Sequence, residues 1–426
     1  MQIIENCKVR EKLYIEKLPN GLTIMVIPKE GRNKKYAIYG THFGSIDNCF
    51  IIPGQKEEKK IPDGVAHFLE HKVFEQEDGT NSLDTLSALG VDANAYTTNG
   101  HTAYLFECTD KFEEAFDVLL DYVQSPYFTK ENVEKEKGII GQEITMYEDD
   151  PSTVVYMNAL KCLYQNNPVS IDIAGTIESI SEITPEILYD CYHTFYHPSN
   201  MAIVLCGDFE PDEIINIIKK RIKNNEEQGE IKRIYPEEKK QIAKEKIEVE
   251  MEVSNPLFVI GWKDMVAKPE ELVKKHIAIE ILLNLVIGKS SQLYQKLYEQ
   301  GLLLAEPELS YEFSEQYAHP LISGQSKDPA KVYEEIKQTI KQYTKEGIKQ
   351  EEFERIKKKI YGAYVSEYND VSNIAKMFLA DYFKGINSFE YLEEYQQVTK
   401  EYTKQVLEEV FREDNIVLSI VKGKEE

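Results

Sequence analysis

The sequence lacks long apolar runs, a leader-like amino terminus and closely paired cysteines. No apolar run approaches the ~18 residues of a membrane-spanning helix, and the opening MQIIENCKVREK has no apolar core of a signal peptide. The six cysteines form no C-x-x-C pair, which argues against a structural zinc site and against a disulfide framework. We therefore expect a cytoplasmic protein with free thiols and no membrane segment.

Basic residues are scarce relative to acidic ones. The 426 residues include 50 Lys and Arg against 74 Asp and Glu, which gives a net charge of −24. Nucleic-acid backbones and anionic membranes bind basic faces, so neither is expected as a partner. The acidity either serves solubility alone or also favours basic peptides.

The stretch from Gly64 to Gln76 carries His67, Glu70 and His71 in an H-x-x-E-H pattern. On an α-helix the two histidines lie one turn apart on the same face, so both imidazoles can reach one metal ion. Glu70 lies on nearly the same face, within reach of a water molecule at such a metal. Asp63 is expected to be the helix N-cap. The pattern is typical of inverzincin metallopeptidases, and the alternative is an ordinary helix with solvated histidines.

A catalytic zinc ion takes three protein ligands and leaves one position open, so two histidines are not enough. Glu136 and Glu143 lie seven residues apart in a helix predicted to begin at Thr129, and they share one face. Ile139 and two further isoleucines are expected to line the other side. One carboxylate can complete a His-His-Glu site and the other can orient a ligand histidine, unless the pair is simply a solvated face.

The length predicts two domains, and the order of predicted strands and helices is similar in the two halves. We expect an α+β fold of two similar domains, residues 1–223 and 247–426, each with helices packed on a largely antiparallel sheet. The charged stretch 224–246 is expected to link them. Two unrelated domains are the alternative, because no repeat is visible residue by residue.

Further motifs accompany the H-x-x-E-H pattern along the chain. They are NGL at Asn20–Leu22, GS at Gly44-Ser45, NAYTTNGHTAY at Asn94–Tyr104, AGT at Ala174–Thr176, and YHPSNM followed by GD between Tyr196 and Asp208. In this order they resemble the insulinase (pitrilysin) family of zinc peptidases, and in particular the zinc-bearing subunit of its bacterial two-subunit members.

The resemblance implies a role for each candidate residue. His67, His71 and Glu143 would bind Zn²⁺, Glu70 would be the general base, and Glu136 would support a ligand histidine. The implied activity is that of a zinc metalloendopeptidase acting on unfolded peptides or small proteins in an enclosed chamber. The alternatives are a non-catalytic assembly or scaffold member of the family, and a metal-binding regulator without hydrolysis.

The resemblance also places substrate on one strand. Asn94 and Ala95 would lie on the strand that pairs with the substrate backbone, since an exposed strand edge binds extended peptides through main-chain hydrogen bonds. The alternative for Asn94 is a turn residue. His101 lies beside the same strands and could contact a reaction intermediate, although a turn role is the better interpretation of a lone histidine.

The family resemblance further implies that this chain is half of a four-domain clamshell, with an inactive C-terminal domain. The other half normally supplies an Arg and a Tyr to the substrate carbonyl. Here Tyr298 and Leu304 stand at the matching positions, and no arginine lies between residues 288 and 310. We expect a heterodimer with a related subunit that supplies the Arg/Tyr pair. The alternative is a homodimer or monomer with other donors, such as Lys296.

Overall fold

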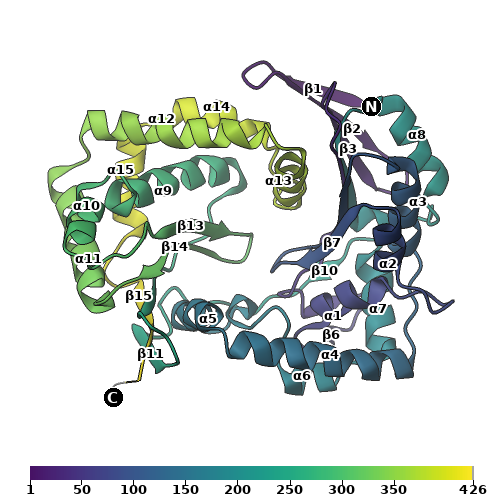
Figure 1. The fold of residues 1–426 in the computed structure, drawn as a ribbon, viewed down its shortest axis with the longest axis horizontal. Helices are drawn as coiled ribbons and strands as arrows, with labels where there is room; N and C mark the ends of the chain where they lie inside the picture. The colour runs from purple at the N-terminus through teal and green to yellow at the C-terminus, as the bar shows by residue number, and fades with distance from the viewer. Residues whose placement is uncertain (425–426) are drawn as a thin grey trace. The chain divides into compact units, whose positions relative to one another are not determined.

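The computed structural model describes residues 1–424 and forms two compact units, each combining helices with a β-sheet (Figure 1). Unit 1 comprises Met1–Ile144, Asp172–Tyr235 and Val365–Ser388, and unit 2 comprises Thr145–Ile171, Pro236–Tyr364 and the chain from Phe389 onward. The predicted α+β class is confirmed. The units differ from the contiguous domains expected from the sequence, because residues 145–171 and 365–388 each belong to the unit formed mainly by the other half of the chain.

The main sheet of unit 1 has seven strands in the order β1-β2-β3-β9-β4-β8-β7. The strands are β1 (Gln2–Asn6), β2 (Glu11–Lys17), β3 (Thr23–Pro28), β4 (Lys35–Thr41), β7 (Asp92–Thr97), β8 (Thr102–Cys108) and β9 (Met201–Gly207). All neighbours are antiparallel except β3 and β9, as expected for a largely antiparallel sheet. A small second sheet joins β10 (Lys232–Arg233), β5 (Cys49–Ile51) and β6 (Lys59–Lys60).

Helices cover both faces of this sheet. They are α1 (Val65–Val73), α2 (Ser82–Ala88), α3 (Phe112–Tyr122), α4 (Lys130–Glu148, whose last turn belongs to unit 2), α6 (Ile177–Ser181), α7 (Pro185–Phe195), α8 (Pro211–Arg221) and α13 (Val371–Phe383). Side chains alternate between the faces of a strand. Ala37 and Tyr39 of β4 therefore point into the core with α1, α3, α7 and α8, whereas Gly40 faces α13. A Cβ on Gly40 would lie 2.8 Å from Cδ2 of Leu379, so a glycine permits this close packing.

The sheet of unit 2 repeats the topology of five strands of unit 1. Its order is β11-β15-β12-β14-β13, and only β11 and β15 are parallel. The strands are β11 (Lys246–Glu250), β12 (Leu257–Trp262), β13 (Glu308–Phe313), β14 (Ala318–Gln325) and β15 (Ile416–Lys422). The order matches β3-β9-β4-β8-β7 with the parallel pair in the same place, so the expected pair of similar domains is confirmed.

The helices of unit 2 come from three stretches of the chain. They are α5 (Pro151–Leu163), α9 (Leu272–Ile287), α10 (Gln292–Glu299), α11 (Pro329–Glu346), α12 (Gln350–Glu367, whose last turn belongs to unit 1), α14 (Phe389–Gln397) and α15 (Lys400–Val410). α5 packs on β15 and β12, and α13 packs on the equivalent strands β9 and β4 of unit 1. Each half of the sequence thus contributes one helix to the other unit's sheet, which explains the discontinuous units.

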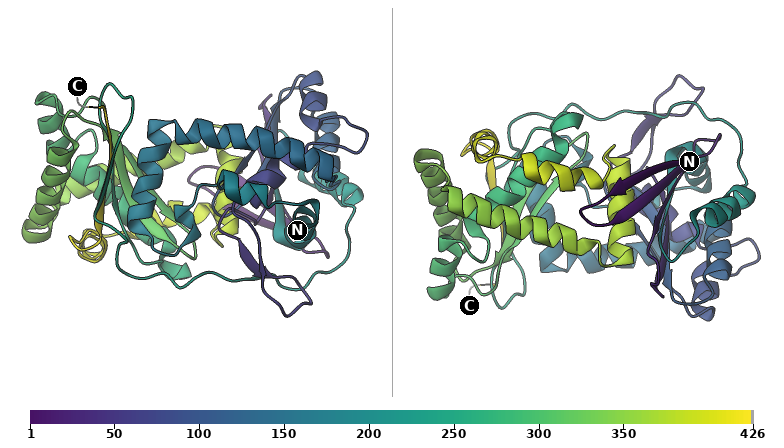
Figure 2. Two further views of the ribbon diagram at one scale, coloured as in Figure 1. Left: turned by 90° about the horizontal axis from the view of Figure 1, so that it is seen from below. Right: turned by 90° about the horizontal axis from the view of Figure 1, so that it is seen from above.

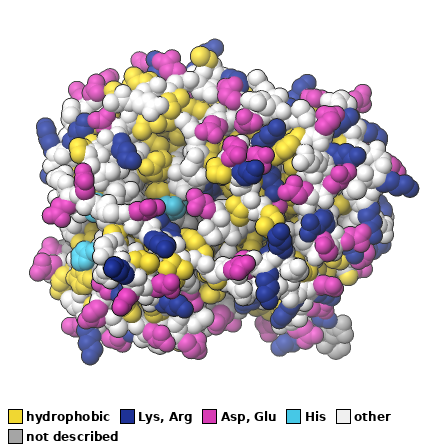
Figure 3. All heavy atoms as spheres, turned by 180° about the vertical axis from the view of Figure 1, so that it is seen from behind, with side chains coloured by type: hydrophobic (Ala, Val, Ile, Leu, Met, Phe, Trp, Pro, Cys, Tyr) yellow, Lys and Arg dark blue, Asp and Glu magenta, His cyan; other side chains and the backbone are white. Residues whose placement is uncertain are grey.

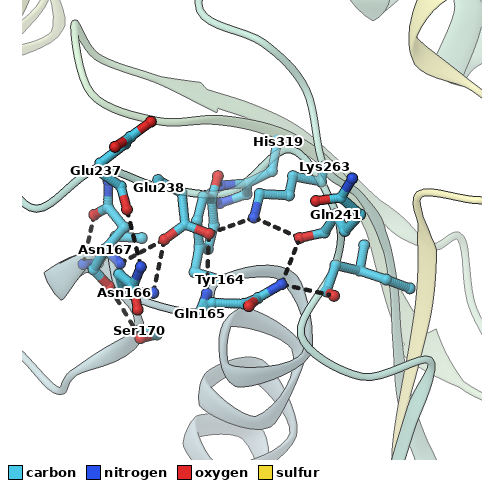
Figure 4. A network of polar contacts seen from close by, with 12 residues as sticks. Tyr164, Gln165, Asn166, Asn167, Ser170, Glu237, Glu238, Gln241, Lys263 and His319 are labelled. Atoms are coloured by element: carbon cyan, nitrogen blue, oxygen red, sulfur yellow. Dashed lines mark hydrogen bonds and ion pairs between the residues drawn. The ribbon is translucent and has the colours of Figure 1, made fainter.

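The predicted linker 224–246 is anchored rather than free. On unit 1, Arg233 of β10 donates from Nε to Oδ1 of Asp47 at 3.1 Å. On unit 2, the Glu238 carboxylate accepts backbone N–H groups of residues 165–167 at 2.7–3.0 Å and pairs with Nζ of Lys263 at 2.5 Å (Figure 4). The stretch is therefore divided between the two units instead of standing apart from both.

The thiols and the surface agree with the composition. All six cysteines are free, and all but Cys7 are buried. On the face drawn in Figure 3, acidic and basic side chains are interspersed. Among residues 1–424, no helix combines the length and apolar character that crossing a bilayer requires.

Candidate metal and catalytic site

Helix α1 begins after Gly64, whose lack of a side chain lets the carbonyl group of Ala174 approach closely. Gly64 is the N-cap with φ of 93°, and a Cβ there would lie 2.4 Å from the carbonyl oxygen of Ala174. The expected N-cap, Asp63, is wrong, because no side chain caps this helix and Oδ1 of Asp63 instead accepts from Nδ2 of Asn48 at 3.0 Å. Only glycine tolerates this backbone conformation without strain in so small a space. The apolar side chains of α1 are buried: Val65, Phe68, Leu69 and Val73.

The structure brings His67, His71 and Glu143 together. Nε2 of His67 lies 3.6 Å from Oε1 of Glu143, and Nε2 of His71 lies 3.5 Å from Oε2 of the same carboxylate. One ligand atom from each of the three residues lies within 4.8 Å of the others. Ligands about 2.0–2.1 Å from a tetrahedral zinc ion stand roughly 3.4 Å apart. The donor types therefore fit a zinc ion, and the two separations from Glu143, 3.6 and 3.5 Å, are close to that value.

Helix α4 supplies both glutamates from one continuous 19-residue helix (Figure 2). Glu136 is buried, and its Oε1 lies 3.0 Å from Nδ1 of His71. This contact leaves Nε2 of His71 facing Glu143, so the geometry separates the two carboxylates that the sequence pattern left interchangeable. Ile140 and Ile144 are buried, but Ile139 is 46% exposed, so its expected place in the apolar side of α4 is wrong.

The pair Glu136 and His71 is also coupled electrostatically. Burial raises the pKa of Glu136, but the hydrogen bond to His71 and the charge of Lys72 outweigh burial, and the pKa lies below its usual value. Burial lowers the pKa of His71, but the hydrogen bond and charge of Glu136 outweigh it, and that pKa is raised. An oriented imidazole with a carboxylate on its far nitrogen is a better-held and more basic metal ligand.

Lys72 belongs to this site and was not identified from the sequence. Its side chain is fully buried, with Nζ 2.5 Å from Oε2 of Glu75 and 3.6 Å from Oε2 of Glu136. A lysine is rarely this buried unless it is paired. Its position was readable in principle, because it lies three residues after Leu69 and four after Phe68, on the apolar face of α1.

Glu70 is held by a threonine that the sequence analysis also did not single out. Oγ1 of Thr97, on β7, donates to Oε2 of Glu70 at 2.5 Å. Burial raises the pKa of the half-buried Glu70, and the hydrogen bond from Thr97 offsets only part of that effect. The only sequence indication was the alternation along β7, which puts Thr97 on the same side as Ala95.

β7 is the edge strand beside α1. It pairs with β8 on one side, and within residues 1–424 no strand pairs with its other side. Asn94 is exposed, and its Oδ1 accepts the N–H of Ala95 at 2.8 Å. His101 is buried in the turn between β7 and β8, with Nδ1 3.1 Å from Oγ1 of Thr98 and its carbonyl bound to the N–H of Thr98 at 2.8 Å. These contacts support the turn interpretation of His101.

Comparisons with known proteins cover both halves of the chain. A family model described as insulinase (peptidase family M16) matches residues 49–177, and one described as the peptidase M16 inactive domain matches residues 182–360. The uncharacterized zinc protease YmfH of Bacillus subtilis is 39% identical over 427 residues, which cover 99% of each chain.

Solved structures share the same fold. An M16-like peptidase from Alicyclobacillus acidocaldarius is 35% identical with a TM-score of 0.93, over 99% of this chain and 100% of that one. The periplasmic protease PqqL from Escherichia coli is 16% identical with a TM-score of 0.77, and the match covers 100% of this chain but 48% of that one. Because YmfH is 39% identical over 99% of each chain, the chain belongs to the insulinase family of peptidases, peptidase family M16.

Proposed function

We propose that this chain is a zinc metalloendopeptidase that hydrolyses peptide bonds in unfolded peptides or small proteins. The observation that carries the proposal is the convergence of His67, His71 and Glu143 on one point, with Glu70 on the same helix as the two histidines. The names of relatives such as YmfH, a zinc protease, support the same chemistry.

Each residue of the site would have a distinct role. His67, His71 and Glu143 would hold zinc, and Glu136 would keep the His71 ring in place. When bound, zinc supplies a Lewis acid that polarises the scissile carbonyl and makes water at the site more acidic. Glu70 accepts the proton of the attacking water and donates it to the leaving amine.

We propose the unpaired edge of β7 as the substrate platform. An extended peptide would add a strand there through main-chain hydrogen bonds near Asn94 and Ala95. Such pairing depends little on substrate side chains and requires an unfolded segment. It therefore favours unfolded peptides over folded proteins, and leaves sequence preference to the walls of the enclosing chamber.

The substitution Glu70→Gln tests the assignment. The variant is expected to keep its zinc content and to lose about 10²–10⁴-fold in hydrolysis of a peptide library, because only the proton transfer is removed. Glu77→Gln, an exposed position beyond α1, is the matched control and is expected to keep normal turnover. Near-normal turnover by Glu70→Gln would exclude Glu70 as the base. A zinc-loaded wild type that hydrolyses nothing, even with a partner, would favour the scaffold alternative.

We further propose that the active form is a cytoplasmic heterodimer with a related subunit that supplies the Arg/Tyr pair. Tyr298 and Leu304, at the positions expected for that pair, are 55% and 38% exposed, and neither offers a cation. Lys296, the alternative donor, is paired with Glu335 at 2.6 Å. The match to about half of PqqL agrees with a larger assembly of this fold.

Mixing experiments test the partner. Without the Arg/Tyr pair, the chain alone is expected to be about 10²–10³-fold slower than the mixture with its related subunit. Full activity of the chain alone, as monomer or homodimer, would contradict the half-enzyme proposal while leaving the zinc site intact.

A further inference from the structure

The motif Gly44-Ser45 contributes nothing to the proposed metal site, and its contacts are with the turn between β7 and β8. The backbone N–H of Ser45 donates to the carbonyl oxygen of Thr98 at 3.1 Å. Oγ of Ser45 donates to Oδ1 of Asn99 at 2.9 Å, and the N–H of Ile46 donates to the Asn99 carbonyl oxygen at 3.3 Å. A Cβ on Gly44 would lie 2.2 Å from that oxygen, so only glycine allows this approach. The motif therefore holds the turn at the end of β7.

Asp47 fixes the loop that carries this motif. It is 2% exposed, and its Oδ2 accepts the N–H of Gly44 at 2.9 Å. Its Oδ1 accepts from Nε of Arg233 at 3.1 Å and from the hydroxyl of Tyr235 at 2.6 Å. Burial raises the pKa of Asp47, and the charge of Arg233 is the strongest of the effects that oppose this rise. A buried carboxylate that accepts three hydrogen bonds is held in one orientation.

Arg233 reaches this loop from β10, 186 residues further along the chain than Asp47. Its guanidinium also donates to the carbonyl oxygen of His42 and to Oδ1 of Asn200, the latter at 3.1 Å. Its Cζ lies 5.5 Å from the ring centroid of Phe195, and β10 pairs with β5, the strand that follows the loop. The planar guanidinium, with several donors in fixed directions, thus binds both ends of the segment 42–47 at once.

These contacts form one connected path from Arg233 through Asp47 and Gly44 to the turn of the β7 hairpin, and the whole path lies within unit 1. Within residues 1–424 β7 is paired on one side only, so the contacts at its turn restrain an edge that no second strand holds. We propose that Arg233 is a positioning residue for peptide substrates, because it fixes the place of the β7 edge through Asp47. The inference rests on the proposed function of that edge as the substrate platform.

Methylation of the substrate backbone tests the position of this edge. The probe is a quenched fluorescent decapeptide that the wild type cleaves, alone or with its related subunit, compared with analogues that each carry one N-methylated peptide bond. Analogues methylated where the peptide bonds to β7 are expected to lose roughly fivefold in kcat/KM, because each lacks one main-chain hydrogen bond. In Arg233→Met, kcat/KM for the parent peptide is expected to fall about tenfold, and the methylation penalty to shrink to within about twofold. A variant that is merely less stable loses active molecules but keeps the ratio between the peptides.

Two further variants accompany Arg233→Met. Lys232→Met, at the exposed neighbouring position on β10, is the matched control and is expected to keep the wild-type rates and penalty. Tyr235→Phe removes one hydrogen bond to Asp47 but leaves the charge pair intact, so it is expected to fold and to shift both readouts the same way by a smaller factor. Hydrogen exchange at the amide of Ser45, expected to be at least about tenfold faster in Arg233→Met, reports the loosened turn without any turnover.

Failure of the inference and failure of the substrate platform give different results. A wild type that cleaves every methylated analogue as fast as the parent peptide would exclude pairing at β7, and the role of Arg233 with it. A wild-type penalty that persists unchanged in Arg233→Met, or wild-type exchange at Ser45 in that variant, would overturn the role of Arg233 alone and leave the platform in place.

Discussion

Lys72 offers the sharpest test of how the metal site is supported. Its ammonium has no exposure to solvent and lies 3.6 Å from the buried carboxylate of Glu136. At an effective dielectric constant of about 20, two unit charges at that separation attract by about 4–5 kcal/mol. Lys72→Met retains the length of the side chain but leaves the buried Glu136 carboxylate with the His71 imidazole and without the Lys72 ammonium. Breaking one side of a buried pair is expected to lower the free energy of unfolding of unit 1 by about 3–5 kcal/mol.

The assay has to report on unit 1, since Trp262 fluorescence reports on unit 2. Native-state hydrogen exchange of backbone amides in α1 and in α4 up to Ile144, measured with a chelator present, gives the local free energy of opening. Lys135→Met, an exposed lysine on α4, is the matched control and is expected to change stability by less than about 0.5 kcal/mol.

A double-mutant cycle separates the two carboxylates beside Lys72. Glu136→Gln removes the charge that Lys72 compensates, so the two changes are expected to couple by roughly 1–3 kcal/mol. Glu75 is 26% exposed, so Glu75→Gln is expected to couple more weakly. A loss below about 1 kcal/mol for Lys72→Met, or additive losses with Glu136→Gln, would refute the assigned pairing.

Three further predictions concern other parts of the molecule. Glu143→Gln is expected to lower zinc content more than Glu136→Gln does, because Glu136→Gln should weaken zinc affinity only about 10–100-fold. If metal analysis shows the reverse order, Glu136 and not Glu143 is the zinc ligand. Thr97→Val should leave zinc content unchanged and lower kcat about tenfold, because Glu70 loses a charge-assisted hydrogen bond, and unchanged kcat would contradict this contact. Burial lowers the pKa of His319 to about 3, so the unfolded state alone takes up this proton below pH 6.5, and stability should fall as pH falls. The expected loss is about 2 kcal/mol between pH 8 and pH 5 in urea unfolding followed by Trp262 fluorescence, and an unchanged pH slope in His319→Asn would contradict it.

The sequence by itself determined the local geometry. Helical spacing placed His67 and His71 on one face of α1, and the seven-residue interval placed Glu136 and Glu143 on one face of α4. Asn99-Gly100, a pair typical of hairpin turns, lies between β7 and β8. These features depend on periods of 2 and 3.6 residues and on turn chemistry, which short segments specify alone.

Tertiary structure alone decided which of these faces meet. The sequence pattern could not tell whether Glu136 or Glu143 turns toward Nε2 of the histidines, because both lie on the same face of α4, and only the packing of α4 against α1 distinguishes them. Tertiary packing also places Thr97 beside Glu70, because Thr97 lies on a strand 27 residues further along the chain. Long-range contacts of this kind depend on how apolar faces are buried together. The periodicity of one segment does not indicate which other segment it packs against.

Sequence patterns also did not predict that each half of the chain contributes one helix to the other unit's sheet. The composition of 224–246 predicted a boundary in the chain, and the strand pattern predicted two similar sheets. Neither indicated that α5 covers β12 and β15 while α13 covers β4 and β9. Each helix covers the equivalent pair of strands in its own unit, because the two sheets share one topology. Local sequence does not distinguish the two surfaces, since each offers a glycine where the helix packs: Gly40 of β4 lies against Leu379 of α13, and Gly261 of β12 lies near Leu163 of α5.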